Sequence, residues 1–158
     1  MTGDRAHGVP IGGPDYSPGF WLWHATLRWQ REIAAVLTPL GLTHVQFVLL
    51  SCAWWLNDRG EVPNQLALAR QAGTDVKMTS EVVRRLAAKG LLARETDPQD
   101  TRARQLRITP DGIAVALRAI AAVEQADQEF FGPAQETGLD SDQIAALLRR
   151  LAEAPPVS

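Results

Sequence analysis

Residues 75–109 constrain the fold of this chain more than any other part of its sequence. Asp75 is a residue type that favours a helix N-cap, a helical pattern follows over residues 76–88, and Gly90 ends it. Four side chains recur at i, i+3, i+7 and i+10 and are predicted to form one buried stripe: Val76, Thr79, Val83 and Leu86. The opposite face carries Lys77, Met78, Glu81 and Arg85, with Arg84 and Lys89 beside them.

Two strands are predicted after this helix, at residues 91–95 and 105–108. The segment TDPQDTRAR between them is a cluster of turn-forming residues that is too polar to be buried. Before the helix, Asn64 is predicted to cap a short helix over residues 65–72, which Gly73 ends. Two helices joined by a tight turn and followed by a hairpin form a winged helix-turn-helix.

Positive charge is concentrated in the same part of the chain. Between Lys77 and Arg107 there are eight Lys or Arg residues and four Asp or Glu residues. The segment therefore carries a net charge of about +4 in a chain whose formal net charge is −2, which leaves about −6 for the remainder. This concentration indicates a surface that binds a polyanion. A solvated helix face followed by a solvated loop is the alternative interpretation.

The motifs RRLAAKGLLAR, DPQDTRAR and ITPDG together resemble the MarR family of bacterial transcription regulators. In that family the hairpin, or wing, reads Asp-Pro-x-Asp-x-Arg, which is matched here by Asp97, Pro98, Asp100 and Arg102. A Leu-Thr-x-x-Gly segment usually opens the next helix, and this chain has Ile108, Thr109 and Gly112 there. Thr101 stands where many members carry a first wing arginine, so Arg102 and Arg104 must supply the positive charge of the wing.

The remaining helices are predicted at residues 20–37, 44–56 and 110–131, and from 140 or 141 to about 151. The expected fold is mainly α: a winged helix-turn-helix with about six helices and a small antiparallel hairpin, with room for a short third strand at residues 61–62. Residues 1–19 contain five glycines and three prolines and are predicted to form a flexible arm.

The resemblance extends over roughly residues 20–150 and implies a division of the chain. Residues 20–40 and 110–152 would be dimerisation helices, and residues 43–109 the DNA-binding lobe. Apolar residues on two sides of the helix at 20–37 agree with this division, because such a helix needs more than one neighbour. The resemblance also implies a homodimer that binds double-stranded DNA at a pseudo-palindromic operator. This homodimer would act as a repressor, and a small aromatic or phenolic ligand would release it from the DNA.

The predicted DNA contacts come from the second helix of the pair and from the hairpin. Glu81 lies one turn before Arg85 and is expected to orient that guanidinium or to accept from a cytosine amino group. Arg102 at the hairpin tip is expected in a narrow minor groove. The full set of predicted DNA-binding residues is Lys77, Met78, Thr79, Ser80, Arg84, Arg85, Arg102 and Arg104.

All five tryptophans lie in the first two predicted helices, at positions 21, 23, 29, 54 and 55. Packing in the core and between subunits is one interpretation, and an effector pocket between the dimer region and the DNA-binding lobe is the other. Trp21, His24 and Arg28 share a helix face and offer an apolar wall, a titratable group and a cation, which suits an anionic aromatic ligand. The predicted ligand-binding residues are Trp21, His24, Arg28, Trp54 and Trp55.

Other chemistry has little support in the sequence. The three histidines are scattered without the spacing of metal ligands, and neither a phosphate-binding loop nor a serine nucleophile motif is present. We therefore predict no catalytic residue, metal or cofactor. Cys52 is the single cysteine, so no intrachain disulfide can form, which favours a reducing cytoplasm. It lies among apolar residues and is expected to be an inert core thiol. Membrane spans and secretion signals are not expected either. The alternative function is a winged-helix module that binds an acidic protein partner rather than DNA.

Overall fold

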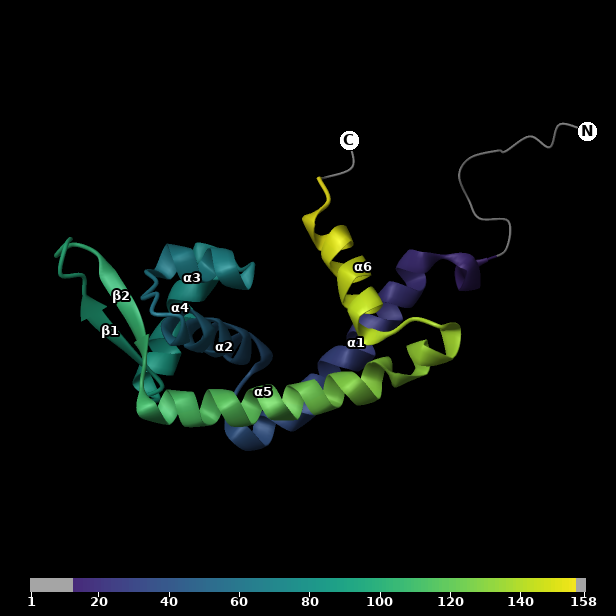
Figure 1. The fold of residues 1–158 in the computed structure, drawn as a ribbon, viewed down its shortest axis with the longest axis horizontal. Helices are drawn as coiled ribbons and strands as arrows, with labels where there is room; N and C mark the ends of the chain where they lie inside the picture. The colour runs from purple at the N-terminus through teal and green to yellow at the C-terminus, as the bar shows by residue number, and fades with distance from the viewer. Residues whose placement is uncertain (1–12, 156–158) are drawn as a thin grey trace, which may run out of the picture.

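The computed structural model describes residues 13–155 of the chain. Figure 1 gives the order of the elements. Within that range there are six α-helices: α1 (Pro18–Leu37), α2 (His44–Asp58), α3 (Gln65–Ala72), α4 (Val76–Ala88), α5 (Pro110–Phe131) and α6 (Ser141–Glu153). Strands β1 (Leu92–Thr96) and β2 (Arg104–Ile108) pair antiparallel. Short 3-10 turns lie at η1 (Pro14–Tyr16), η2 (Thr38–Leu40) and η3 (Gly132–Thr137). The predicted mainly α fold with a winged helix-turn-helix is confirmed.

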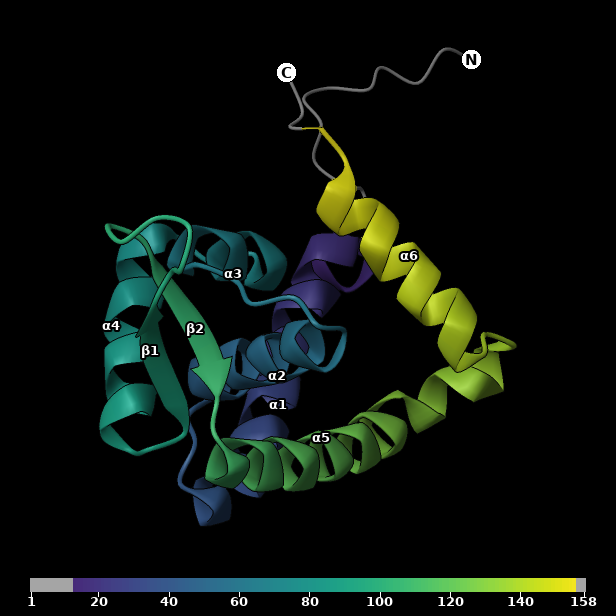
Figure 2. The ribbon, with the colours of Figure 1, turned by 60° about the vertical axis from the view of Figure 1, so that its left-hand side comes forward.

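The elements form a compact lobe and a longer helical part. Helices α2, α3 and α4 pack on one another, and the β1–β2 hairpin lies along α4 at the outer edge of the lobe (Figure 2). Helix α5 starts beneath the hairpin, packs against α2 and α1, and leads to α6. Helix α6 stands away from the lobe and has no buried residue.

One hydrophobic core connects the two parts. Its fully buried members include Leu50 of α2, Leu86 of α4 and Leu106 of β2, and α5 adds small residues such as Ala116. Helix α1 enters the core only through its second half, with Ile33 and Leu37. The hairpin and the long helices therefore share the same buried apolar contacts.

Polar side chains define where the helices begin. The side chains of Ser17, Thr43, Asn64, Asp75, Thr109 and Asp140 each accept a hydrogen bond from a backbone N–H in the first turn of the helix that follows. At Thr43 and Asp140 a glutamine three residues later returns a bond to the cap, which completes a capping box. These local signals explain why α3, α4 and α5 have the predicted limits.

Several predicted boundaries were wrong. The strand predicted at 91–95 is displaced by one residue, because the backbone of Leu91 bonds to Leu86 and Thr109 rather than to the hairpin. The strand predicted at 105–108 ends as predicted and starts one residue earlier. The predicted strand at 61–62 is absent from the described residues; instead Pro63 accepts from the Leu106 N–H (2.8 Å), and Asn64 forms an isolated bridge with Gln105. Helix α1 begins at Pro18, inside the predicted flexible arm, and residues 1–12 of that arm lie outside the described residues.

An aromatic junction joins α1, α2 and α5. The Trp29 ring contacts the His44 ring edge-on at 5.0 Å between centroids, and its Nε1 donates to Asp127 Oδ1 at 2.7 Å. Burial lowers the pKa of His44, and the Asp127 carboxylate offsets part of that effect. Within residues 13–155 no single helix has the length and apolar character to cross a membrane; α1 and α2 meet that criterion only as a pair bent by 71°.

The start of α5 is packed directly against the end of α4. The Thr109 hydroxyl donates to Gly90 O (2.6 Å) and accepts from Gly112 N (3.0 Å), while Thr109 N donates to Leu91 O (3.1 Å). A Cβ added to Gly112 would lie 2.1 Å from Leu91 O and 2.8 Å from Ile108 Cγ1. The glycine of the ITPDG motif is therefore required because backbone occupies the space that any side chain would need.

Gly112→Ala is expected to lower the free energy of unfolding by about 1–3 kcal/mol, because α5 must move away from the hairpin to admit a methyl group. Urea unfolding followed by tryptophan fluorescence, at one fixed protein concentration, measures the change. Gly132→Ala is the matched control, since Gly132 is helical and an added Cβ there meets nothing within 4 Å. Equal midpoints for the two variants would contradict the steric account.

Candidate nucleic-acid interface

Helix α4 presents a polar face to solvent and an apolar face to the core. Its buried residues are Thr79, Val82, Val83 and Leu86, and its exposed residues include Lys77, Met78, Glu81, Arg84 and Arg85. The predicted buried stripe was wrong at Val76, which is 48% exposed. Val76 is the first residue of the helix and projects beyond the core, and Val82 is buried instead.

Thr79 is the one predicted DNA-binding residue that the structure buries completely. Its Oγ1 donates to Asp75 O and lies 2.8 Å from Thr74 Oγ1. These bonds stabilise the turn between α3 and α4, where Gly73 has a left-handed φ of 67°. The prediction of a direct DNA contact from the Thr79 side chain is therefore wrong; Thr79 positions the helix.

Glu81 and Arg85 form the predicted pair on the exposed face. Arg85 Nη2 lies 2.6 Å from Glu81 Oε1, and both side chains are more than half exposed. Such a surface pair adds little stability, but it limits the directions in which the guanidinium can point.

A hollow of about 340 Å³ opens on the same face, lined by Lys77, Ser80, Glu81, Arg84 and Arg94. Arg94 belongs to β1, and its Nη2 donates to Ser80 O across 3.5 Å. The sequence prediction left Arg94 out of the DNA-binding set. The signal that could have found it is strand alternation, because Arg94 shares a strand face with Leu92, whose side chain is buried.

The acidic residues of the wing motif build the hairpin tip. Asp97 Oδ1 accepts from Gln99 N (2.8 Å), and Asp100 Oδ1 accepts from Arg102 N (3.0 Å). The carboxylates thus stabilise backbone turns, and the Arg102 side chain is left exposed at the tip. Arg104 is also exposed, and its Nη1 donates to Thr96 Oγ1 at 3.0 Å.

Two other cations of the segment interact with the protein itself. Lys89 Nζ donates to Gly41 O (2.5 Å) and to Gln46 Oε1 (2.9 Å), which ties the end of α4 to the start of α2. Arg107 Nε pairs with Glu95 Oε2 across the hairpin at 3.0 Å. The net charge of the segment therefore overstates the number of cations that face solvent without a partner.

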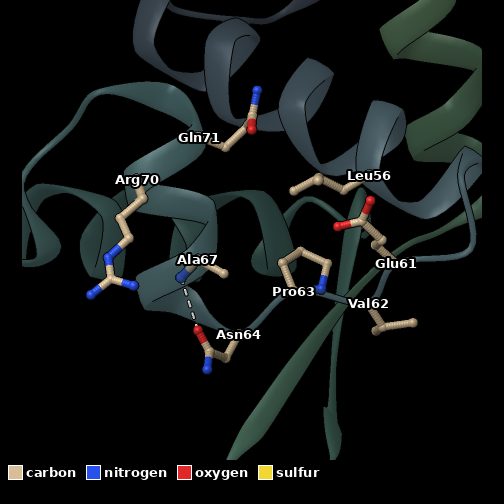
Figure 3. A pocket seen from close by; sticks show the side chains of 8 residues that line it. All are labelled: Leu56, Glu61, Val62, Pro63, Asn64, Ala67, Arg70 and Gln71. Carbon is tan, nitrogen blue, oxygen red and sulfur yellow. Dashed lines mark hydrogen bonds between the residues drawn. The ribbon is translucent and has the colours of Figure 1, made fainter.

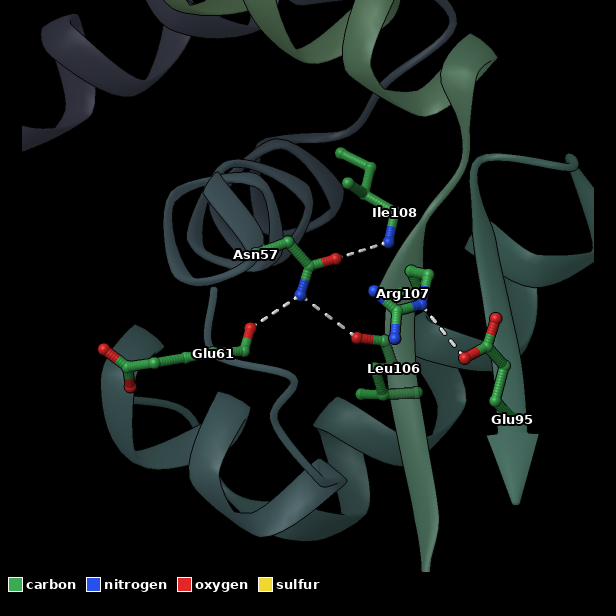
Figure 4. A network of polar contacts seen from close by, with 6 residues as sticks. All are labelled: Asn57, Glu61, Glu95, Leu106, Arg107 and Ile108. Atoms are coloured by element: carbon green, nitrogen blue, oxygen red, sulfur yellow. Dashed lines mark hydrogen bonds and ion pairs between the residues drawn. The ribbon is translucent and has the colours of Figure 1, made fainter. Parts of the chain in front are cut away.

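Asn57 fastens the hairpin to the lobe. Figure 4 shows its amide between α2 and β2: Oδ1 accepts from Ile108 N (2.7 Å), and Nδ2 donates to Leu106 O (3.3 Å) and Glu61 O (3.0 Å). The helix predicted from the sequence ended at residue 56, one residue before Asn57, and Asn57 was assigned no role. A contact between residues 49 or 51 positions apart leaves no local pattern that could reveal it.

The predicted ligand-binding residues fall into two separate groups. On α1, the Trp21 and His24 rings are 6.0 Å apart, while Arg28 pairs with Glu32 (2.7 Å) and lies 5.2 Å over the Phe130 ring. On α2, Trp54 borders two small cavities. One, of about 220 Å³, is lined by Trp54, Asn57, Asp58, Arg107, Ile108 and Ile113. The other, of about 230 Å³, is lined by Ser51, Cys52, Trp54, Trp55, Gln71 and Ile120.

Neither of these cavities includes Trp21, His24 or Arg28, so the structure does not bring the five predicted residues together. Cys52 is half-buried rather than in the core, and burial raises the pKa of its thiol. Another hollow, of about 540 Å³, lies between α2 and α3 (Figure 3). Its rim carries both Glu61 and Arg70, so it favours neither sign of charge.

The chain is similar to known proteins over most of its length. The MarR family model matches residues 42–103. An HTH-type transcriptional regulator of Bacillus subtilis, YdcH, is 44% identical over 124 residues, which cover 78% of this chain and 84% of that protein. An HTH-type transcriptional repressor of Mycobacterium tuberculosis, Rv2887, is 31% identical over 118 residues, with coverages of 74% and 82%.

Among solved structures, the chain is similar to BpsR of Bordetella bronchiseptica, with a TM-score of 0.76 and 30% identity. The match covers 93% of this chain and 100% of the BpsR chain. That structure concerns the mechanism by which 6-hydroxynicotinic acid regulates DNA binding by BpsR.

Asn57→Ala is expected to lower the free energy of unfolding by roughly 1–3 kcal/mol, because it leaves the Ile108 N–H and two carbonyl groups without their partner. Chemical denaturation measures the loss, and hydrogen exchange at Ile108 should accelerate more than exchange within α1. Asp58→Ala, at an exposed neighbouring position, serves as the control. An unchanged exchange rate at Ile108 would mean that the Asn57 amide does not hold the hairpin.

Proposed function

Because this chain belongs to the MarR family of DNA-binding transcription regulators, we propose that it acts as a homodimeric repressor at a pseudo-palindromic operator. A small aromatic or phenolic ligand releases it from the DNA. The single observation that carries the proposal is the exposed basic face formed by α4 and the hairpin. Members of the family are regulators, and we assign no enzymatic activity. The proposal implies a cytoplasmic protein, because the DNA lies there.

The two DNA-facing elements have different tasks in this proposal. Helix α4 enters the major groove, where each base pair presents a distinct edge, with Met78, Ser80 and Arg85 nearest the bases. The hairpin reaches the neighbouring minor groove or its phosphates with Arg102 and Arg104. The exposure of these side chains supports the assignment, except that Ser80 is only half-exposed.

Exposed apolar side chains on α1 and α6 support a two-fold dimer. Trp23 is 63% exposed and Leu151 is 63% exposed, and similar values hold for Trp21, Leu22 and Leu147. Helix α6 and the first part of α1 lie at the end of the molecule away from the hairpin (Figure 1). Residues 20–40 and 110–152 are therefore the proposed dimerisation helices, and residues 43–109 the proposed DNA-binding lobe.

The cavity bordered by Trp54 and Arg107 is the proposed effector site. It lies between the first turn of α5 and the lobe and combines an aromatic wall with polar groups of both signs, Asp58 and the Glu95-paired Arg107, which suits a small polar aromatic ligand. BpsR, whose ligand 6-hydroxynicotinic acid has this chemistry, supports the choice of ligand class. Trp21, His24 and Arg28 form a second aromatic and cationic surface, which lies on α1.

Arg102→Ala should weaken binding to all DNA sequences and reduce the slope of log affinity against log salt by roughly one unit, because a phosphate or minor-groove contact is lost. Arg85→Ala should cost about 1–3 kcal/mol and relax the preference at one base position per half-site. Titrations against operator and scrambled DNA at several salt concentrations measure both effects.

Arg59→Ala, an exposed cation at the end of α2 that lies outside both the basic face and the proposed dimerisation helices, is the control for that titration. Light scattering of the same samples should give twice the chain mass of 17.3 kDa. A monomer would overturn the dimer. The protein-interaction module would replace the regulator if the unmodified chain bound no DNA selectively.

6-Hydroxynicotinic acid, or a related aromatic carboxylate, is expected to quench tryptophan fluorescence saturably and to weaken operator binding. Trp54→Leu should abolish both effects, because it removes the aromatic wall of the cavity. Trp55→Leu, which replaces the neighbouring tryptophan of α2 that does not line this cavity, should retain the effect on DNA binding. If Trp54→Leu responded like the unmodified protein, the effector site would have to lie elsewhere.

A further inference from the structure

Three cationic side chains from two different elements surround one hollow on the DNA-facing surface. Lys77 and Arg84 lie about two turns apart on the same side of α4, and Arg94 comes from β1. Arg94 is directed toward α4, since its Nη2 lies 3.5 Å from Ser80 O. The hollow, of about 340 Å³, is open to solvent and large enough for a phosphate group.

The charge in this hollow is not balanced from within. Glu81 also lines it, but Glu81 Oε1 is bound to Arg85 Nη2 at 2.6 Å. Among the residues that the structure describes, no ion pair involves Lys77, Arg84 or Arg94. Three positive charges therefore surround a space whose only carboxylate is already paired, which favours an anion there.

We propose that Lys77, Arg84 and Arg94 together hold one phosphate of the DNA backbone, and that Arg84 serves this phosphate rather than a base. The proposal rests on the DNA-binding function proposed above. Two guanidinium groups offer paired N–H donors that match the non-bridging oxygens of a phosphodiester, and the lysine adds a point charge. We call Lys77, Arg84 and Arg94 the phosphate clamp.

The clamp has a consequence for how α4 is seated. A phosphate held between the helix and the first strand of the hairpin fixes the depth and tilt of α4 in the groove, since phosphate contacts set the register of a protein on DNA. Arg85, oriented by Glu81, is then the arginine of α4 that remains for base recognition. The proposal thus separates two neighbouring arginines by function.

Operator DNA with a single neutral methylphosphonate, moved through each backbone position in turn, tests the clamp. The unmodified protein should lose affinity roughly tenfold or more at one position per half-site, because a charge-assisted contact disappears. Arg94→Ala should bind unmodified operator about that much more weakly and should show no additional loss at the same position. Arg94→Lys should keep part of the sensitivity, and Arg59→Ala, at an exposed cation outside both the basic face and the proposed dimerisation helices, should keep all of it.

The outcomes separate the clamp from the function on which it rests. If the unmodified protein bound no DNA selectively, both would be overturned. If it bound operator but Arg94→Ala kept the unmodified profile of methylphosphonate sensitivity, only the clamp would be overturned. The same holds if Arg84→Ala relaxed the preference at one base pair, because Arg84 would then read a base. Thermal unfolding of each variant confirms an intact fold, since all three side chains are exposed.

Discussion

The start of α5 lies so close to the end of α4 that only a glycine fits at position 112. Thr109 bonds to Gly90, Leu91 and Gly112 at this junction. These four residues therefore join the end of α4, the start of the hairpin and the start of α5. Asn57 adds the second strand to the same unit from the side of α2. These bonds join the lobe to α5, so the orientation of the basic face relative to the proposed dimer helices depends on them.

Local signals in the sequence were sufficient for the helices and insufficient for the surface they present. Asn64, Asp75 and Thr109 fixed the starts of α3, α4 and α5, because a cap acts within one turn. Thr79 was misassigned although its place in the apolar stripe already indicated burial. Asn57 and Lys89 acquire their roles from partners 43 to 51 residues away, and no periodicity encodes such a partner. For the same reason a shared helix face could suggest Trp21, His24 and Arg28 but could not reveal which other helix lies opposite them.

The net charge of the segment is a poor guide to how many cations are available to a ligand. Lys89 bonds to the loop before α2, and Arg107 and Arg85 pair with glutamates. Asp97 and Asp100 in turn stabilise the hairpin tip through backbone bonds rather than opposing the cations. Between Lys77 and Arg107, the cations that neither form an ion pair within residues 13–155 nor bond to the loop before α2 lie in two places: Lys77, Arg84 and Arg94 at the hollow beside α4, and Arg102 and Arg104 on the hairpin.

The proposed effector cavity touches the DNA-facing hairpin directly. Arg107 and Ile108 of its lining belong to β2 or end it, and Asn57, also in the lining, is the residue that fastens β2 to α2. A ligand there can change DNA affinity only if it binds one position of the hairpin better than another, because equal affinity for both positions shifts neither. Linkage then requires that operator DNA weaken ligand binding by the same factor by which the ligand weakens DNA binding. A ligand that bound in this cavity with equal affinity in the presence and absence of operator would therefore not change DNA binding and would not be the effector.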